Sequence, residues 1–171
     1  FAGYESYLQN QLDSAEFHYV LGSVHPQIPE FRERYWQDDL VSVQRTYFRL
    51  LADAAETGLF DCLAHPDLIK NQTSLVWDPP IVMDDIRRSL DRIADTGTAM
   101  ELNTSGVNKV IAEMNPFPQM LVEMRQRDIP VVVGADAHVP ERVSDGFLDA
   151  LDLLHECGYR QVSLFLNRTR Q

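Results

Sequence analysis

Metal-binding or polar side chains follow four apolar segments of this sequence, each at the point where the segment ends. They are His25, His65 with Asp67, Asn103, and Asp136 with His138. Neutral imidazole and carboxylate groups bind zinc, manganese and iron readily. Because Asp136 and His138 flank a single residue, both side chains would point to the same side of an extended segment. This pattern predicts a metal site built from His25, His65, Asp136 and His138.

The segments that must position these side chains are of two alternating kinds. Short apolar runs rich in β-branched and aromatic residues predict strands at 18–24, 59–64, 98–102, 130–134 and 161–166. Apolar residues at three- and four-residue steps predict helices at 39–57, 81–94, 116–127 and 144–158, the last capped by Ser144. This alternation is typical of an α/β fold with parallel strands, in which ligands bind at the carboxyl ends of the strands.

Each candidate residue also has a simpler interpretation when it is taken alone. His25 fits a hydrogen-bonded core histidine, His65 could simply end a strand, and Asp67 could cap a turn. Four titratable groups at the ends of three strands favour a shared metal site over these separate interpretations. His18 and His155 lack such a context, and we interpret both as structural or solvent-facing.

The composition indicates one globular domain. The 171 residues are 44% hydrophobic and 24% charged, which is enough apolar material for a sizeable core. The net charge of −11 disfavours binding to nucleic acids or anionic membranes, but it allows a small phosphorylated substrate at a local cation. The sequence shows neither a signal-peptide pattern nor an apolar run of the ~18 residues that span a bilayer. With only Cys62 and Cys157, interpreted as buried thiols, we expect a cytoplasmic protein.

Four strings in this order resemble the PHP (polymerase and histidinol phosphatase) superfamily. They are "LGSVH", "FDCLAHPDLIK", "AMELNTSG" and "VVVGADAH", and the ending "GYRQVSLFLNR" is most similar to the histidinol-phosphatase branch. The resemblance implies a distorted seven-stranded, TIM-like β/α barrel with up to three divalent metal ions, zinc, manganese or iron. It also implies hydrolysis of phosphate esters. In this branch the reaction converts L-histidinol phosphate to L-histidinol and phosphate, in histidine biosynthesis.

The resemblance also assigns roles to the strand-end residues. It implies that His25 and His65 bind one metal ion, Asp136 a second and His138 a third, and that a metal-activated water attacks phosphorus. Asp136 or His138 would be the catalytic group that assists proton transfer to the leaving alcohol, and the sequence does not choose between them.

Substrate binding is expected at Asn103, Lys70 and Lys109. The histidinol-phosphatase branch places phosphate-binding arginines at positions that match Asn71 and Asn108 here. Lys70 and Lys109 stand beside these positions and could substitute, although lysine lacks the bidentate geometry of arginine. The alternative is that both are exposed loop lysines.

The chain resembles only the later two-thirds of the family pattern. The H-x-H strand, the further histidine and the bridging glutamate that open the family's sequence have no counterpart in residues 1–171. We therefore expect a single PHP-like domain that lacks the N-terminal strands and forms an incomplete barrel. Two other functions remain open: a PHP-type nuclease or other phosphoesterase, and a non-catalytic incomplete barrel. The oligomeric state is not indicated.

Overall fold

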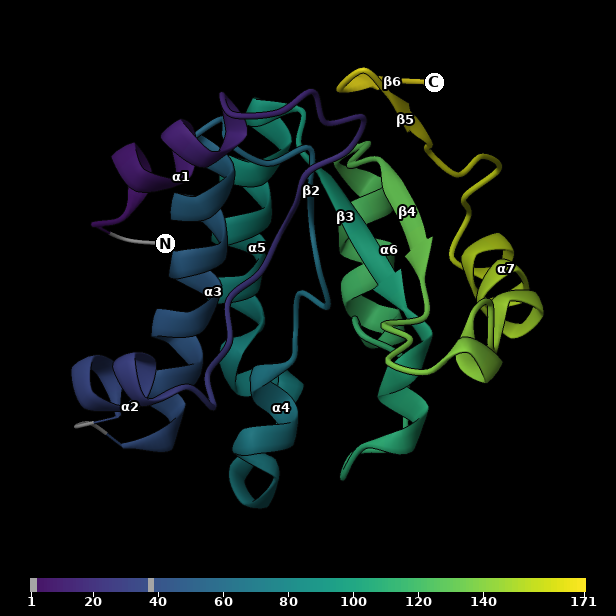
Figure 1. Ribbon diagram of the computed structural model, residues 1–171. Helices are drawn as coiled ribbons and strands as arrows, with labels where there is room; N and C mark the ends of the chain where they lie inside the picture. Colours follow the sequence, from purple (N-terminus) through teal and green to yellow (C-terminus); the bar gives the residue numbers. More distant parts are fainter. Residues whose placement is uncertain (1–2, 37–38) are drawn as a thin grey trace.

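Four parallel strands form the sheet that carries the candidate residues (Figure 1). The computed structural model describes residues 3–36 and 39–171. The strands β1 (Leu21–Gly22), β2 (Cys62–Leu63), β3 (Ala99–Asn103) and β4 (Val131–Gly134) lie in sequence order, and each pairs with the next in parallel. The predicted α/β class with parallel strands is therefore confirmed, with β1 and β2 much shorter than the apolar segments that contain them.

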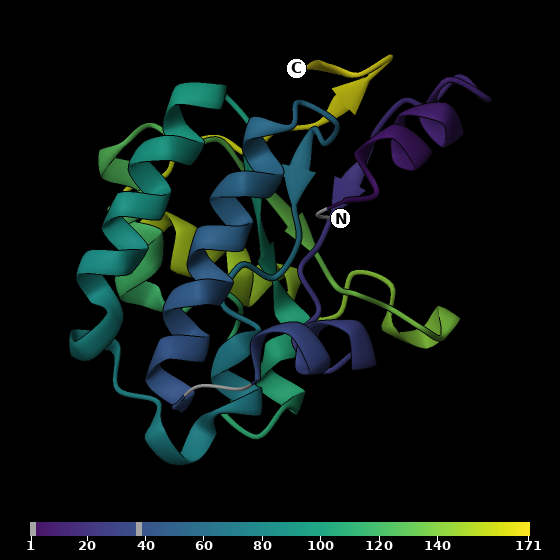
Figure 2. The same cartoon turned by 90° about the vertical axis from the view of Figure 1, so that its left-hand side faces the viewer.

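Long amphipathic helices connect these strands and cover one face of the sheet. Helices α3 (Leu40–Glu56) and α5 (Pro79–Thr96) pack along each other, and α6 (Pro118–Gln126) lies beside α5 (Figures 1 and 2). Asp39 caps α3, because its carboxylate accepts hydrogen bonds from the N–H groups of Val41 and Ser42. Gly97 ends α5 in a left-handed conformation. Each predicted helix is thus present, with bounds that differ by a few residues.

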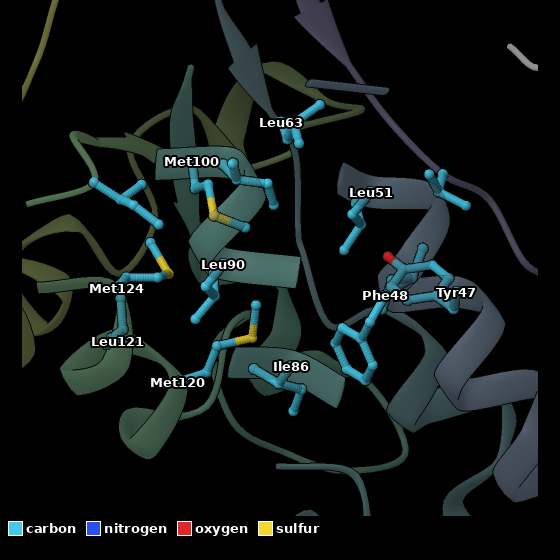
Figure 3. Packing of buried hydrophobic residues seen from close by; sticks show 14 of the residues in the cluster. Tyr47, Phe48, Leu51, Leu63, Ile86, Leu90, Met100, Met120, Leu121 and Met124 are labelled. Carbon is cyan, nitrogen blue, oxygen red and sulfur yellow. The ribbon is translucent and has the colours of Figure 1, made fainter. Parts of the chain in front are cut away.

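The core lies between these helices and the sheet. Figure 3 shows Leu90 of α5 among Met100 of β3 and Met120 and Met124 of α6, all fully buried. On α3, the largest fully buried side chains are those of Tyr47, Phe48 and Leu51, and Phe48 contacts Tyr47 edge-on at 5.6 Å between ring centroids. This packing holds the strands in register, so it fixes where their carboxyl ends lie.

Several short elements were not predicted. They are the helices α1 (Glu5–Leu12), α2 (Pro29–Tyr35) and α4 (Ile69–Gln72), and the 3-10 turns at Ser74–Val76, Thr104–Asn108 and Pro140–Arg142. The predicted helix at 144–158 is present as α7 (Phe147–Glu156), which begins later than expected. The expected cap of α7 at Ser144 is wrong, because the residue before the helix is Gly146 and Ser144 lies in the left-handed region at φ 65°. None of the described helices is both long and apolar enough to cross a membrane.

The predicted fifth strand of the sheet is wrong. Within 161–166 only Phe165–Leu166 (β5) is a strand, and it pairs antiparallel with Thr169–Arg170 (β6) in a separate hairpin. Both turn residues, Asn167 and Arg168, have positive φ, as a type I′ hairpin turn of two residues requires. Next to β4, the N–H of Ser163 donates to the carbonyl of Val131 at 2.7 Å, but no ladder follows in the described chain.

Contacts with the start of β1 and β2 hold this hairpin in place. The Arg168 guanidinium donates to the Asp61 carboxylate at 3.1 Å and to the carbonyl of Leu59 at 2.8 Å. Phe165 lies 5.3 Å from Tyr19, measured between ring centroids. The C-terminal segment thus leaves the edge of β4 for contacts near the other edge of the sheet, and the described strands do not close into a barrel.

Candidate metal centre and active site

Parallel pairing brings the first two candidate histidines together at the carboxyl edge of the sheet. His25 follows β1 and His65 follows β2, and Gly22 of β1 is aligned with Leu63 of β2. Their rings lie 5.1 Å apart between centroids and meet edge-on at 74°. Two imidazoles at this separation can bind one metal ion between them after small side-chain rotations. The geometry therefore supports the pairing of His25 with His65 that the resemblance implies.

His65 is buried and held in an unusual backbone conformation. Its φ is 31°, and only 4% of its surface is exposed. Its N–H donates to Oε2 of Glu101 at 3.0 Å, and its carbonyl accepts from the hydroxyl of Tyr47 at 3.3 Å. Its ring atom Nδ1 is buried and has no hydrogen-bond partner among residues 3–36 and 39–171. An unpartnered buried nitrogen is costly unless a ligand uses its lone pair, so Nδ1 suits metal binding.

Both imidazoles favour the neutral form that binds metals. Burial lowers the pKa of His65 to about 4, and the nearby imidazole of His25 acts in the same direction. Burial also lowers the pKa of His25, against the opposing effect of Asp136. Nδ1 of His25 lies 3.0 Å from Nε2 of Gln27, which leaves Nε2 of His25 as the nitrogen available to a metal. At neutral pH neither ring would have to lose a proton before it coordinates an ion.

A cation and a carboxylate stand beside the two imidazoles. Oδ2 of Asp136, just past the end of β4, lies 3.8 Å from Nζ of Lys109 and 3.4 Å from the hydroxyl of Ser105. Nζ of Lys109 donates to the same hydroxyl at 3.1 Å. Asp136 has φ 47°, a second left-handed residue at this edge. Because Asp136 and Lys109 both act electrostatically on His25 and on His65, all four residues share one region.

His138 is exposed, whereas Asn103 is buried. The side chain of His138 is 84% exposed, and its Nδ1 lies 2.8 Å from the carbonyl oxygen of Asp136. Asn103 is buried, with its amide nitrogen donating to Glu101 at 2.9 Å and its oxygen accepting from the N–H and hydroxyl of Ser105. Asn103 therefore organises the loop that carries Ser105 and Lys109, whereas His138 lies at the surface.

Lys70 lies in a buried polar network. Its side chain is fully buried, and its Nζ lies 2.9 Å from Asp67, 2.8 Å from the carbonyl of Met114 and 3.2 Å from Glu113. The interpretation of Lys70 as an exposed loop lysine is therefore wrong, and its expected phosphate-binding role finds no support in this geometry. Asp67, which also accepts from the N–H of Phe117 at 2.9 Å, is its structural counter-ion.

Asn71 and Asn108, the positions that match the phosphate-binding arginines of the family, differ in burial as Lys70 and Lys109 do. Asn71 is buried, with its side-chain oxygen accepting from the N–H of Ile111 at 2.9 Å, whereas Asn108 is exposed. Lys70 and Lys109 are the only lysines in the sequence. Lys109 alone is therefore the lysine placed to meet a substrate at this edge.

Comparisons with known proteins agree with this architecture. No family model matches the chain. A probable histidinol-phosphatase from Deinococcus radiodurans is 36% identical over 175 residues, which cover 99% of this chain and 65% of that protein. Another, from Clostridium acetobutylicum, is 28% identical over 160 residues, which cover 88% of this chain and 62% of that protein. The resemblance to histidinol-phosphatases of the PHP type is confirmed. This chain spans less than two thirds of the length of either relative.

A solved structure shows the same fold. The histidinol phosphate phosphatase from Lactococcus lactis, crystallised with zinc, L-histidinol and phosphate, matches with a TM-score of 0.81 at 20% identity. The match covers 99% of this histidinol-phosphatase-like chain and 67% of the solved one. The chain therefore has the TIM-like α/β fold of that protein, with the barrel not closed by the strands described.

Two of the four predicted metal ligands, His25 and His65, lie side by side in this histidinol-phosphatase-like chain. Among the described residues, no group of three or more histidine, cysteine or acidic side chains surrounds one point. His25 and His65 nevertheless form a fitting pair, because both are neutral and one has an unpartnered buried nitrogen. The donor set thus suits one divalent ion with open positions for water or substrate, as catalytic zinc sites have.

Sequence reasoning missed Glu101. This carboxylate is buried in β3 between the ends of β2 and β4, and burial raises its pKa. The signal for it was present, because a single acidic residue inside the apolar run "TAMEL" is rarely buried without a specific reason.

The low pKa of His65 predicts a pH-dependent stability in the metal-free protein. The unfolded chain binds a proton at His65 near pH 6.5, whereas the folded chain binds it only near pH 4. Stability is therefore lost as pH falls through this window, by about 1 kcal/mol between pH 7 and pH 5.5. The His65→Asn variant lacks this loss, and asparagine tolerates the positive φ.

Urea unfolding with a chelator present, at pH 7 and pH 5.5, measures the difference. The exposed His155→Asn variant is the control and keeps the wild-type response. Equal pH responses of His65→Asn and the wild type would contradict the neutral, buried state of His65.

Proposed function

We propose that this chain belongs to a single-domain, metal-dependent phosphoric monoester hydrolase that converts L-histidinol phosphate to L-histidinol and phosphate. One observation carries the proposal: two neutral imidazoles, His25 and His65, lie 5.1 Å apart at the edge that also holds Asp136 and Lys109. The solved histidinol phosphate phosphatase of the same fold contains zinc, L-histidinol and phosphate. The predicted cytoplasmic location stays a prediction.

His25 and His65 would hold the first divalent ion, with Asp136 and His138 as ligands of further ions. When bound, such an ion lowers the pKa of a water molecule and polarises a phosphoryl oxygen. Zinc is the first choice because of the Lactococcus lactis structure, and manganese and iron suit the same donors. A full set of three ions would need ligands from outside the described residues.

Lys109 would bind the phosphate group of the substrate. Its side chain is only a quarter exposed, and its Nζ lies 3.8 Å from Asp136, one of the proposed metal ligands. An anionic oxygen placed there would receive a charge-assisted hydrogen bond from Nζ. Ser105 holds the ammonium in this position through its hydroxyl. Asn103 supports the same loop, so its contribution to substrate binding would be indirect.

Asp136 and His138 remain the two candidates for proton transfer to the leaving alcohol. His138 is the better placed, since its Nδ1 lies 2.8 Å from the carbonyl oxygen of Asp136 and its side chain is largely exposed. A ring fixed by one nitrogen can hold or release a proton at the other. Because this leaves a single nitrogen, His138 would act in this step only when that nitrogen is not bound to a metal ion. Asp136, next to Lys109, would serve as a ligand and hold the ammonium in place.

Two other functions are the alternatives to this proposal: a nuclease and a non-catalytic incomplete barrel. A nuclease of the same type is disfavoured by the net charge of −11, which repels a polynucleotide. A non-catalytic incomplete barrel would follow from the open sheet and the partial donor set.

Metal removal and a substrate panel test the proposed function. Phosphate release from L-histidinol phosphate should fall at least about 100-fold after chelation, because metal activation of water is lost. Adding Zn²⁺ or Mn²⁺ should restore it. The panel contains L-histidinol phosphate, other amino-alcohol phosphates, sugar phosphates and short oligonucleotides. Faster cleavage of oligonucleotides, activity indifferent to chelators, or no activity with zinc bound would contradict the proposal.

Removing the ammonium of Lys109 should weaken substrate binding. We expect Lys109→Ala to lower kcat/KM for L-histidinol phosphate about 10- to 100-fold, the effect of one lost charge-assisted hydrogen bond. Lys109→Arg should recover most of this loss, because the charge returns. Arg88→Ala, on the exposed face of α5, is the matched control and should change nothing. An Lys109→Ala variant as active as the wild type would exclude Lys109 from the substrate site.

A further inference from the structure

Glu101 contacts the chain at the ends of two neighbouring strands. It lies in β3, is 5% exposed, and its Oε2 accepts from the N–H of His65 at 3.0 Å. Its Oε1 lies so close to Gly134 of β4 that a Cβ there would be 1.9 Å away. Because β3 is between β2 and β4 (Figure 1), one carboxylate binds the N–H of His65 and packs against the chain two residues before Asp136.

The backbone at His65 and at Asp136 has an unfavourable conformation that neighbouring groups must stabilise. His65 has φ 31° and Asp136 has φ 47°, and neither is glycine, so both conformations cost free energy unless neighbours hold them. For His65, the neighbours are Glu101 on the N–H and Tyr47 on the carbonyl. These contacts aim the imidazole at His25 and leave its Nδ1 without a protein partner.

Glu101 is itself poorly placed to bind a metal ion. Oε2 already accepts two hydrogen bonds, from His65 and from Nδ2 of Asn103, the latter at 2.9 Å. Oε1 is packed against the backbone of Gly134. A carboxylate whose oxygens are occupied in this way orients the groups around it, as the outer partners of metal ligands do.

We infer that Glu101 is a positioning residue that sets the affinity of the His25–His65 site for divalent metal by holding the backbone of His65 and the approach to Asp136. This inference rests on the proposed function, since it assumes that these residues bind metal. It adds a residue that neither coordinates the ion nor touches the substrate. Gly134 belongs to the same arrangement, because only a residue without Cβ leaves room for the carboxylate.

Two independent changes test this role through the affinity for zinc alone, measured by competition with a chromophoric chelator. Glu101→Ala removes the carboxylate. Gly134→Ala keeps the carboxylate, but the added methyl group displaces it from its present position. Both should weaken zinc binding about 10- to 100-fold, the usual effect of losing an outer partner of a metal ligand. Glu101→Gln should keep affinity within about threefold, because its amide oxygen can accept from both His65 and Asn103. Gly134→Ala and Glu101→Gln still decide the question if Glu101→Ala does not fold.

The control separates positioning from general destabilisation. Glu123 of α6 is also largely buried and binds Arg87 and Arg127, away from the sheet edge. Glu123→Ala should lower the unfolding midpoint in urea without changing zinc affinity. Wild-type zinc affinity in both Glu101→Ala and Gly134→Ala would overturn the inference, as would equal losses in Glu101→Ala and Glu123→Ala.

A further variant distinguishes this inference from the proposed function. His65→Ala should weaken zinc binding at least as much as Glu101→Ala. If His65→Ala binds zinc like the wild type, the metal site itself is misplaced and the proposed function fails together with the inference. If His65→Ala loses affinity while Glu101→Ala and Gly134→Ala do not, only the role of Glu101 is overturned.

Discussion

Parallel pairing of β1 with β2 is the constraint on which the candidate site depends. It places His25 and His65 side by side, although 40 positions separate them in the chain. The pairing in turn depends on α3 and α5, whose packed apolar faces support the sheet from one side. Because β3 pairs in parallel with both β2 and β4, the carboxyl ends of β2 and β4 lie at the same edge of the sheet. Any chemistry proposed for this chain follows from that shared edge.

The electrostatics of the edge differ from those of the whole molecule. The chain has a net charge of −11, yet the site combines two neutral imidazoles with the ammonium of Lys109. Asp136 provides the compensating negative charge. Such a site attracts a divalent cation and a small anion together, while the rest of the surface repels large polyanions. This contrast agrees with the proposed substrate, a phosphate ester of low mass.

Much of this arrangement could be predicted from the sequence. Alternating apolar runs indicated the parallel strands, and the polar residues after each run indicated the edge where they meet. Local sequence patterns, however, do not predict which segments contact each other in the folded chain. The run at 161–166 has the composition of a core strand, but Arg168 and Phe165 find partners in Asp61 and Tyr19, and a hairpin forms instead. Lys70 has the composition of a loop residue, yet the fold surrounds its ammonium with Asp67, Met114 and Glu113.

The role of Glu101 shows the same limit at the site. An acidic residue in an apolar strand is unusual, but the contacts of Glu101 with His65 and Gly134 exist only after β2, β3 and β4 align. The positive φ values of His65 and Asp136 are likewise set by the packing around them. The residue types at the edge could therefore be predicted, whereas the contacts that orient them could not.

X-ray absorption at the zinc edge, on protein loaded with one equivalent of Zn²⁺, tests the central claim most directly. The account predicts nitrogen and oxygen ligands at about 2.0–2.1 Å, with outer-shell scattering from two imidazoles. That scattering should fall to one imidazole in His25→Ala and in His65→Ala. Two-imidazole scattering that persists in both variants, or sulfur scattering at about 2.3 Å, would contradict a metal site built on His25 and His65.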